Sequence, residues 1–337
     1  MTSQDRLRVG IVGTGAVAQL VHLPFCTNRR DVEVVAVADK DPDKAEALAR
    51  RFHVPGVLST EELLQGDAVD AVILCTPNHL HESEAVTALG TGKHVLVERP
   101  LALTPGGCRA VVEAAESSGR ILVVGMSHRF RPDVAALRAF VAGGELGEVY
   151  AGRVAWMNRF VPMRRTTWRQ NPEEAGGGAL MDLGAPALDL LLWVLGNPTV
   201  QRVSAILSDG EPEVEHAANV LMETDGGLSL SLEVSWTYFA REDTHYLRVL
   251  GREGSGQLPP LEIFKQLGGR PMDVTPEQGG PPRKGGRYLN AHRRQLDHFF
   301  RAARGFAEVE LPRSQAQVMA ILQAAYESAR EGREVEL

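Results

Sequence analysis

The chain has 337 residues, of which 44% are hydrophobic and 23% are charged, and its 43 acidic and 36 basic side chains give a formal net charge of −7. This composition is typical of a globular protein with two cores, and it excludes the collagen-like, disulfide-stapled and intrinsically disordered classes. The net negative charge argues against a nucleic-acid partner, which would require Lys and Arg gathered on one face.

The sequence contains three cysteines, Cys26, Cys75 and Cys108. They form no C-x-x-C pair and have no His at ligand spacing, so we expect buried or semi-buried free thiols and no metal site. The longest apolar stretch, 185–195, contains Pro186 and Asp189 and falls short of the roughly 20 residues that cross a bilayer. The N-terminus shows no signal-peptide pattern, so we expect a cytoplasmic protein with no membrane partner.

The first 127 residues alternate between short aliphatic runs and segments of helical spacing. The aliphatic runs predict strands at 7–12, 32–38, 69–75, 94–98 and 121–125, and helices are predicted after residue 13, at 42–50, up to residue 89 and after Thr104. Strands that are aliphatic on both faces require a parallel sheet covered by helices on both sides. Residues 1–127 are therefore predicted to form a doubly wound α/β domain of the Rossmann type.

Residues 128–337 begin with a predicted helix at 132–141 and then change in character. A clean alternation of apolar and polar residues at 228–238 predicts an antiparallel strand, and weaker runs predict strands at 149–156, 200–207, 217–223 and 246–251. Helices are expected at 179–195, 289–303 and 314–331, and a Gly- and Pro-rich loop is expected at 268–286. We predict a second α/β domain with a mostly antiparallel sheet, whose C-terminal helices can pack back on the first domain.

The most specific short motif is a glycine pattern, Gly13-x-Gly15-x-x-Ala18, between the first strand and the first helix. Asp39 ends the next strand about twenty residues later, a spacing typical of the dinucleotide-binding fingerprint. In that fingerprint Gly13 permits the turn, Gly15 lets the backbone approach the diphosphate, and Ala18 allows close helix packing. The carboxylate of Asp39 favours NAD, whereas the neighbouring Lys40 leaves NADP open.

Three longer runs, CTPNHLH at 75–81, GKHVLVERPLA at 92–102 and GGGALMDLG at 176–184, resemble the Gfo/Idh/MocA family of nicotinamide-dependent sugar and polyol oxidoreductases, as does AAYESA at 324–329. The resemblance implies a Rossmann domain followed by a substrate-binding domain with an open, mostly antiparallel sheet that builds a homodimer or homotetramer. It also implies NAD as cofactor and a small polar molecule as substrate. Carried over onto this chain, the cofactor contacts are expected at Gly13, Thr14, Gly15, Ala16, Val17, Asp39, Lys40, Thr76, Pro77, Asn78, His81, Glu98 and Arg99.

The chain departs from the family at two catalytic positions. Family members carry Glu-Lys-Pro where this chain has Glu98-Arg99-Pro100, and the family's His four residues after Asp182 is Pro186 here. Arg99 cannot take up a proton, because its guanidinium stays charged; we expect it to donate hydrogen bonds to a substrate oxygen. Asp182 is then the candidate base, although it could equally orient a water or serve a structural role.

Substrate contacts are expected from His128 and Arg129, which follow the strand at 121–125 and equally fit a domain interface, and from Trp168 and Arg169, which precede the glycine triplet. Together these features predict an oxidoreductase that moves a hydride between a nicotinamide and a sugar, polyol or related hydroxy or keto compound, with atypical catalytic residues. Two alternatives stay open: a catalytically lapsed NAD(P)-binding regulatory protein, and a redox-assisted glycoside-cleaving enzyme.

Overall fold

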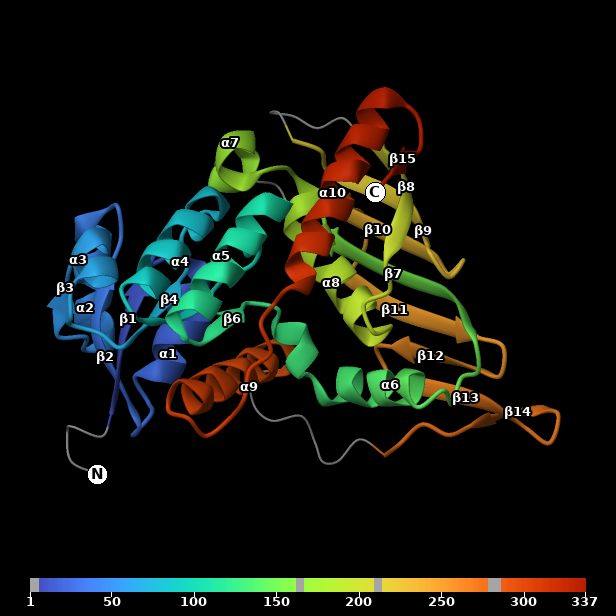
Figure 1. Cartoon of the computed structure of the whole chain (residues 1–337), viewed down its shortest axis with the longest axis horizontal. Helices are drawn as coiled ribbons and strands as arrows, with labels where there is room; N and C mark the ends of the chain where they lie inside the picture. The colour runs from blue at the N-terminus through green and yellow to red at the C-terminus, as the bar shows by residue number, and fades with distance from the viewer. Residues whose placement is uncertain (1–5, 162–166, 209–213, 278–285) are drawn as a thin grey trace. The chain divides into compact units, whose positions relative to one another are not determined.

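The computed structural model describes residues 6–161, 167–208, 214–277 and 286–337. These residues divide into two compact units, which are described separately below (Figure 1). Unit 1 contains the described residues up to Ser127 together with those from Gly286 to Gln315, and unit 2 contains the remainder. The helix Gly286–Ala303 is therefore part of the first unit, although a stretch of more than 150 residues separates it from the rest of that unit in the chain.

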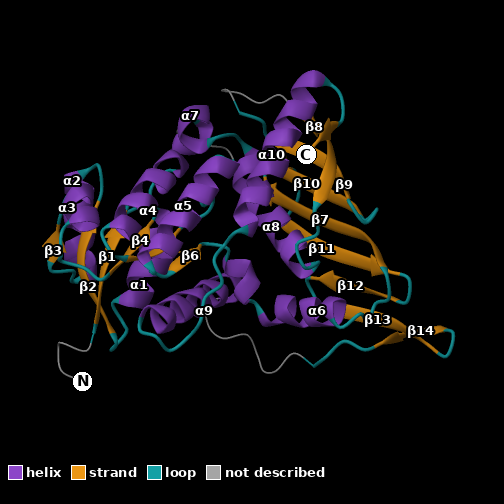
Figure 2. Ribbon diagram, in the orientation of Figure 1, coloured by secondary structure: helices purple, strands orange, loops and turns teal. Residues whose placement is uncertain are grey.

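Unit 1 is a parallel sheet with the strand order β3-β2-β1-β4-β5-β6, packed with helices (Figure 2). Its strands are β1 (Leu7–Val12), β2 (Val32–Ala38), β3 (Gly56–Val57), β4 (Ala71–Leu74), β5 (His94–Val97) and β6 (Leu122–Val124). Its helical segments are η2 (Ala18–His22), α1 (Leu23–Cys26), α2 (Pro42–Phe52), α3 (Thr60–Gln65), η3 (Asn78–Leu80), α4 (His81–Gly90), α5 (Pro105–Ser118) and α9 (Gly286–Ala303). The Rossmann prediction is confirmed, and the strand order reverses between β1 and β4.

Local sequence signals explain where the helices of unit 1 begin. The side chain of Asp41 accepts a hydrogen bond from the Lys44 N–H at the start of α2, and Thr104 accepts one from the Gly107 N–H at the start of α5, with Pro in the first turn of each helix. The core gathers the apolar faces of β1, β2 and α2 with Phe299 and Phe300 of α9, both of which are fully buried.

Unit 2 is a larger sheet with the strand order β14-β13-β12-β11-β7-β10-β9-β8-β15. Its strands are β7 (Val149–Arg159), β8 (Val200–Leu207), β9 (Ala217–Thr224), β10 (Ser229–Tyr238), β11 (Thr244–Gly251), β12 (Gly254–Leu258), β13 (Glu262–Leu267), β14 (Arg270–Asp273) and β15 (Val335–Glu336). Its helical segments are α6 (Pro132–Ala142), η5 (Trp168–Gln170), α7 (Pro172–Ala175), η6 (Leu180–Gly184), α8 (Ala185–Val194) and α10 (Ser314–Glu331), and η4 (Ser127–Phe130) begins at the boundary between the units. The helices α6, α8 and α10 lie on one face of the sheet (Figure 1).

The sheet of unit 2 is mostly antiparallel, as predicted, with one exception. β10 pairs antiparallel with β9 but parallel with β7. The alternation at 228–238 identifies which side chains face the core but carries no information about the direction of the neighbouring strand, because both pairings have the same period of two.

The prediction of a loop over 268–286 is wrong in its first part, where Arg270–Asp273 forms the edge strand β14. All four of its residues are exposed, and Pro271 is tolerated because the strand lies at the edge of the sheet. A strand that buries neither face produces no hydrophobic alternation in the sequence. Residues 278–285 of the same predicted loop lie outside the described residues.

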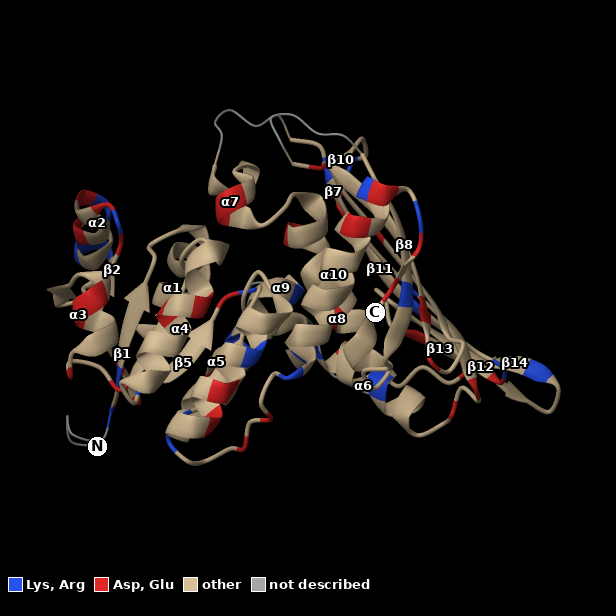
Figure 3. Ribbon diagram, turned by 45° about the horizontal axis from the view of Figure 1, so that its top comes forward, with Lys and Arg blue, Asp and Glu red and all other residues tan. Residues whose placement is uncertain are grey.

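Charge and hydropathy are distributed as in a globular protein. Acidic and basic residues are interspersed along α2, and both kinds occur in the last turns of α10 (Figure 3). Among the described residues, the helical stretch Pro172–Val194 is long and apolar enough to cross a membrane, but 89% of its most apolar window is buried inside the protein. The cysteines are free, with Cys26 and Cys108 buried and Cys75 partly buried, as predicted.

Candidate functional site

The glycine turn of unit 1 connects β1 to η2 at the carboxyl edge of the parallel sheet. Gly13 has a φ of +87°, and a Cβ at this position would lie 2.6 Å from the backbone carbonyl carbon and oxygen of Cys75. A Cβ at Gly15 would meet nothing within 4 Å, so the backbone there borders open space. Ala18 is fully buried where η2 begins. The turn thus leaves room for a diphosphate on one side and excludes a side chain on the other.

Asp39 lies at the end of β2 and is tied to the glycine turn. Its Oδ2 accepts hydrogen bonds from the Thr14 N–H at 2.7 Å and the Thr14 hydroxyl at 2.6 Å, and it lies 3.1 Å from Lys44 Nζ. Burial opposes ionisation of Asp39, but these hydrogen bonds outweigh it and lower the pKa of the carboxyl. Lys40 is exposed, and the cation that pairs with Asp39 is Lys44, in the first turn of α2.

The predicted turn at 76–79 follows β4, next to the glycine turn. Thr76 and Pro77 are partly buried, Asn78 is buried and His79 is exposed. His81 is 1% exposed, with Nδ1 2.7 Å from the Pro100 carbonyl oxygen and Nε2 2.9 Å from the Thr76 carbonyl oxygen. Both ring nitrogens of His81 therefore lie within hydrogen-bond distance of backbone carbonyl oxygens.

Glu98, at the end of β5, is the centre of a cluster of cationic and imidazole side chains. Its Oε1 lies 2.7 Å from His22 Nε2, while His22 Nδ1 is buried without a hydrogen-bond partner, which favours the tautomer that donates from Nε2 to Glu98. Burial raises the pKa of Glu98, but the hydrogen bond from His22 and the electrostatic interactions with His22, His292 and Arg99 reverse the effect and lower it to about 2. Glu98 is thus ionised at neutral pH.

The cluster around Glu98 needs a glycine directly after β6. A Cβ at Gly125 would lie 2.6 Å from Glu98 Oε2. Gly125 therefore leaves room for the carboxylate beside the partly buried Arg99.

In unit 2, Asp182 lies in η6 and is held by two side chains. Trp236 Nε1 donates a hydrogen bond to Asp182 Oδ2 at 3.2 Å, and Arg169 Nε lies 3.6 Å from Asp182 Oδ1. The Arg169 guanidinium also covers the ring of Trp168 at 4.5 Å. The predicted residues Trp168, Arg169 and Asp182 are thus brought together, with Asp182 22% exposed.

The glycine triplet 176–178 fixes the start of the helical stretch that carries Asp182. Glu215 is buried and accepts hydrogen bonds from the N–H groups of Gly178 and Leu180 and from the hydroxyl of Tyr326. A Cβ at Gly178 would overlap the carbonyl oxygen of Glu215, and one at Gly177 would overlap the Tyr326 hydroxyl. Glycine is therefore required here so that Glu215 can satisfy the unpaired N–H groups of the first turn.

Two further predicted substrate residues, His128 and Arg129, also lie in unit 2. The His128 ring lies 4.7 Å from the ring of Trp156, which stacks on His245 at 5.1 Å. The Arg129 guanidinium forms two hydrogen bonds with Asp189 of α8, at 2.8 and 2.5 Å. His128 is thus part of an aromatic row, whereas Arg129 is committed to a buried ion pair.

Replacing Arg129 by Met is expected to lower the free energy of unfolding by about 3 kcal/mol, because the carboxylate of Asp189, which is 2% exposed on its side chain, would lose the cation that compensates its charge. Urea titration followed by circular dichroism measures this loss. Arg202→Met, which removes a cation from a surface ion pair, should cost less than about 1 kcal/mol. Equal effects of the two substitutions would contradict a buried, structural ion pair.

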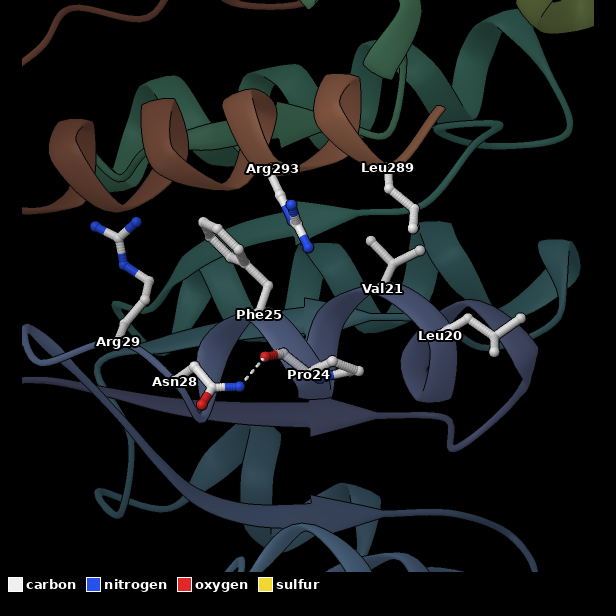
Figure 4. A pocket seen from close by; sticks show the side chains of 8 residues that line it. All are labelled: Leu20, Val21, Pro24, Phe25, Asn28, Arg29, Leu289 and Arg293. Carbon is white, nitrogen blue, oxygen red and sulfur yellow. Dashed lines mark hydrogen bonds between the residues drawn. The ribbon is translucent and has the colours of Figure 1, made fainter. Parts of the chain in front are cut away.

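A cavity of about 350 Å³ lies elsewhere in unit 1, between η2, α1 and α9 (Figure 4). Apolar side chains of η2 and α1 line it, together with Leu289 and Arg293 of α9. Its lining contains none of the residues predicted to bind cofactor or substrate. Arg29 also lines the cavity, and its guanidinium forms ion pairs with Asp31 and Asp297.

Sequence reasoning missed several residues that complete these sites. Lys44 was detectable, because a helix whose N-cap is Asp41 turns its first-turn side chains back toward Asp39. His22 also lies close to the glycine motif in the sequence. His292 is distant in the sequence from Glu98, with which it interacts electrostatically, and Glu215 is distant from the N–H groups that it binds, so no local pattern distinguishes them.

Comparison with known proteins places this geometry in context. The model of an oxidoreductase family with an NAD-binding Rossmann fold, GFO/IDH/MocA, matches residues 7–126, and the model of the GFO/IDH/MocA C-terminal domain matches residues 134–257. D-glucoside 3-dehydrogenase of Escherichia coli K12 is 31% identical over 359 aligned residues, which cover 100% of this chain and 99% of that protein.

Two other similarities extend over most of the chain. Inositol 2-dehydrogenase of Acidothermus cellulolyticus is 30% identical, with 80% of this chain and 78% of that protein covered. The crystal structure of GenD2 from gentamicin A biosynthesis, in complex with NAD, superimposes with a TM-score of 0.82 at 29% identity and covers 99% of this chain and 97% of that one.

Proposed function

Because the chain belongs to the Gfo/Idh/MocA family of oxidoreductases, we propose that it is an NAD-dependent enzyme that interconverts a secondary alcohol and a ketone on a sugar or cyclitol ring. One observation carries the proposal: the glycine turn, open at Gly15 and closed at Gly13, is joined through the buried Thr14 to a partly buried acidic residue, Asp39. Relatives named for a glucoside and for inositol support a polyhydroxylated ring as substrate.

The residues of unit 1 fit NAD. The backbone of the glycine turn borders open space at Gly15, where a diphosphate would bind, and the ionised Asp39 would accept hydrogen bonds from the ribose hydroxyls. Asp39 would repel the 2′-phosphate of NADP, although Lys44 offsets part of its charge. When bound, the nicotinamide supplies the hydride acceptor or donor.

We propose that Arg99 and Asp182 take over the catalytic roles of the lysine and histidine that family members carry at positions 99 and 186. The Arg99 guanidinium donates hydrogen bonds and stabilises negative charge on the substrate oxygen, which suits reduction of a carbonyl better than oxidation of an alcohol. Asp182, oriented by Trp236 and Arg169, handles the proton directly or through a water. Trp168 offers an apolar face on which a sugar ring can stack.

We further propose that the enzyme works in the cytoplasm as a homo-oligomer assembled through the sheet of unit 2. Free thiols support a reducing compartment. Ile206 and Leu221, on the neighbouring strands β8 and β9, are 76% and 56% exposed and offer apolar surface for a second copy. Light scattering of the purified protein tests this part of the proposal.

The decisive experiment combines calorimetry with a turnover assay. The purified protein should bind NADH, and it should reduce keto-sugars or oxidise glucosides and inositols with a change in absorbance at the nicotinamide band. NADH binding without turnover across that panel would support the alternative of a regulatory protein, and Arg99→Lys would then test whether activity is restored. Release of free sugar without net change of NADH would instead support glycoside cleavage.

Replacing Asp39 by Ser should raise the affinity for NADPH relative to NADH by about tenfold, because the substitution removes the charge that repels a 2′-phosphate and leaves Lys44 to attract it. Calorimetric titration with both cofactors measures the ratio. Asp43→Ser, at an exposed position next to Lys44 in α2, is the control and should leave the ratio of NADPH to NADH affinity unchanged. An unchanged ratio in the Asp39 variant would contradict the role assigned to its carboxylate.

A further inference from the structure

Two ionisable side chains of α4, His81 and Glu84, are buried and both bond to Thr76. His81 is 1% exposed and Glu84 is 7% exposed. The His81 ring lies 2.9 Å from the Thr76 carbonyl oxygen, and the Thr76 hydroxyl lies 2.5 Å from Glu84 Oε2. The turn that follows β4 is therefore held at its carbonyl and at its hydroxyl by groups that change charge with pH.

The environment of His81 is unusual because both ring nitrogens face acceptors. The carbonyl oxygens of Pro100 and Thr76 accept hydrogen bonds but cannot donate them, whereas a neutral imidazole has one N–H. Only the imidazolium form can bond to both carbonyls at once. In the neutral form one ring nitrogen presents a lone pair to a carbonyl oxygen, so one of the two contacts is lost.

These contacts reach the proposed cofactor site through the backbone. Pro100 follows Arg99, so His81 links the loop after β5 to the turn after β4. The Cys75–Thr76 peptide lies directly against the glycine turn, since a Cβ at Gly13 would be 2.6 Å from the Cys75 carbonyl carbon and 2.8 Å from the Thr76 nitrogen. A shift of Thr76 would therefore displace the surface on which Gly13 rests.

We propose that His81 and Glu84 are positioning residues that hold the turns around the cofactor and make NAD binding tighter when both residues are protonated. The inference rests on the proposed NAD-dependent function. Neither residue needs to touch the cofactor, since each acts through Thr76. The diphosphate of NAD carries negative charge, so it favours the imidazolium form of His81 and disfavours the ionised form of Glu84.

Glu84 changes charge near neutral pH, whereas His81 gains its proton at a pH below its ordinary range. Burial lowers the pKa of His81, as does His79, while the carbonyls of Pro100 and Thr76 and the carboxylate of Glu98 oppose the shift. Burial raises the pKa of Glu84 to about 7, opposed by the hydrogen bond from Thr76. Cys75, the other titratable group coupled to Glu84 and Glu98, has its pKa raised by burial and stays a neutral thiol. Both groups gain a proton as the pH falls, so both favour tighter binding in acid.

Calorimetric titration of NADH at pH 5.0 and 8.5 tests the proposal. The dissociation constant of the wild type should rise about tenfold between these conditions, with proton uptake on binding, detected by comparing buffers of different ionisation enthalpy. Glu84→Gln, a permanently neutral isostere, should reduce the change to about threefold. His81→Gln should do the same, because its amide does not change charge with pH. The double variant should show nearly no change.

His94→Gln is the matched control. His94 lies at the amino end of β5, its Nδ1 faces the Ile121 N–H at 3.1 Å, and burial lowers its pKa as it does that of His81. This variant should retain the pH dependence of the wild type. Loss of the dependence in His94→Gln, or its persistence in Glu84→Gln and His81→Gln, would overturn the assignment.

A measurement without cofactor separates this inference from the proposed function. The ¹⁵N resonances of the His81 ring, assigned by their loss in His81→Gln, should change from one protonated nitrogen at pH 8 to two at acidic pH. If His81→Gln does not fold, Glu84→Gln and proton uptake by the wild type decide the question. NADH binding that is independent of pH overturns the coupling alone, whereas absence of NADH binding at every pH overturns the proposed function with it.

Discussion

Replacing Gly13 by Ala is expected to weaken NADH binding by at least about 100-fold, the largest effect of any single substitution in unit 1. The backbone at Gly13 has a φ of +87°, which is strained for a residue with a Cβ, and the added carbon would lie 2.6 Å from the Cys75 carbonyl. Relief requires the glycine turn to move away from the turn after β4, and this displaces the N–H groups that would bind the diphosphate. Calorimetry with NADH measures the loss.

Gly119→Ala serves as the control for backbone strain. Gly119 also has a positive φ, +62°, but a Cβ there would meet nothing within 4 Å, and it caps the end of α5. This variant should lose about 1 kcal/mol of stability and retain NADH affinity. If Gly13→Ala binds NADH as tightly as Gly119→Ala does, the glycine turn is not the diphosphate site.

Replacing Asp182 by Asn should lower kcat by about 10²- to 10⁴-fold while the affinity for NADH changes less than about twofold. The amide oxygen of Asn can still accept the hydrogen bond from Trp236, so the side chain keeps its position but loses its charge and its capacity to take up a proton. Steady-state turnover on the active sugar substrate, with calorimetry of NADH binding, separates the two quantities.

Glu173→Gln is the comparison for this experiment. Glu173 is an exposed carboxylate in α7 of the same unit, and its neutralisation should leave kcat unchanged. An Asp182→Asn enzyme with wild-type kcat would assign Asp182 a structural role and move the search for the proton-transfer group to other residues of unit 2.

The fold was predictable from local pattern because each unit buries strands with a distinct periodicity. Aliphatic runs such as 71–74 are buried on both faces and identify a parallel sheet, and the alternation at 228–238 identifies a sheet with one buried face. The exposed edge strand β14 and the parallel pairing of β10 with β7 escaped prediction. Hydrophobic periodicity does not reveal a strand that is exposed on both faces, and it does not reveal the direction of a neighbouring strand.

The candidate site was predictable where its residues lie within one motif. Gly13, Gly15 and Asp39 follow from spacing, and the structure brings them together through Thr14. The residues that influence the charge of the site residues were harder to predict from the sequence. His292 influences the charge on Glu98 from the distant helix α9, because tertiary packing and not sequence proximity places it there.

The hydrogen bond between Tyr326 and Glu215 has a practical consequence for the end of the chain. Tyr326 belongs to the last helix, α10, yet through Glu215 it supports the first turn of the segment that carries Asp182. Truncations, fused tags or natural variants that loosen this helix should therefore alter substrate selectivity or turnover, even though they add or remove no group proposed to meet the sugar. Efforts to change the specificity of this enzyme should therefore preserve the packing of α10, because it supports the position of Asp182.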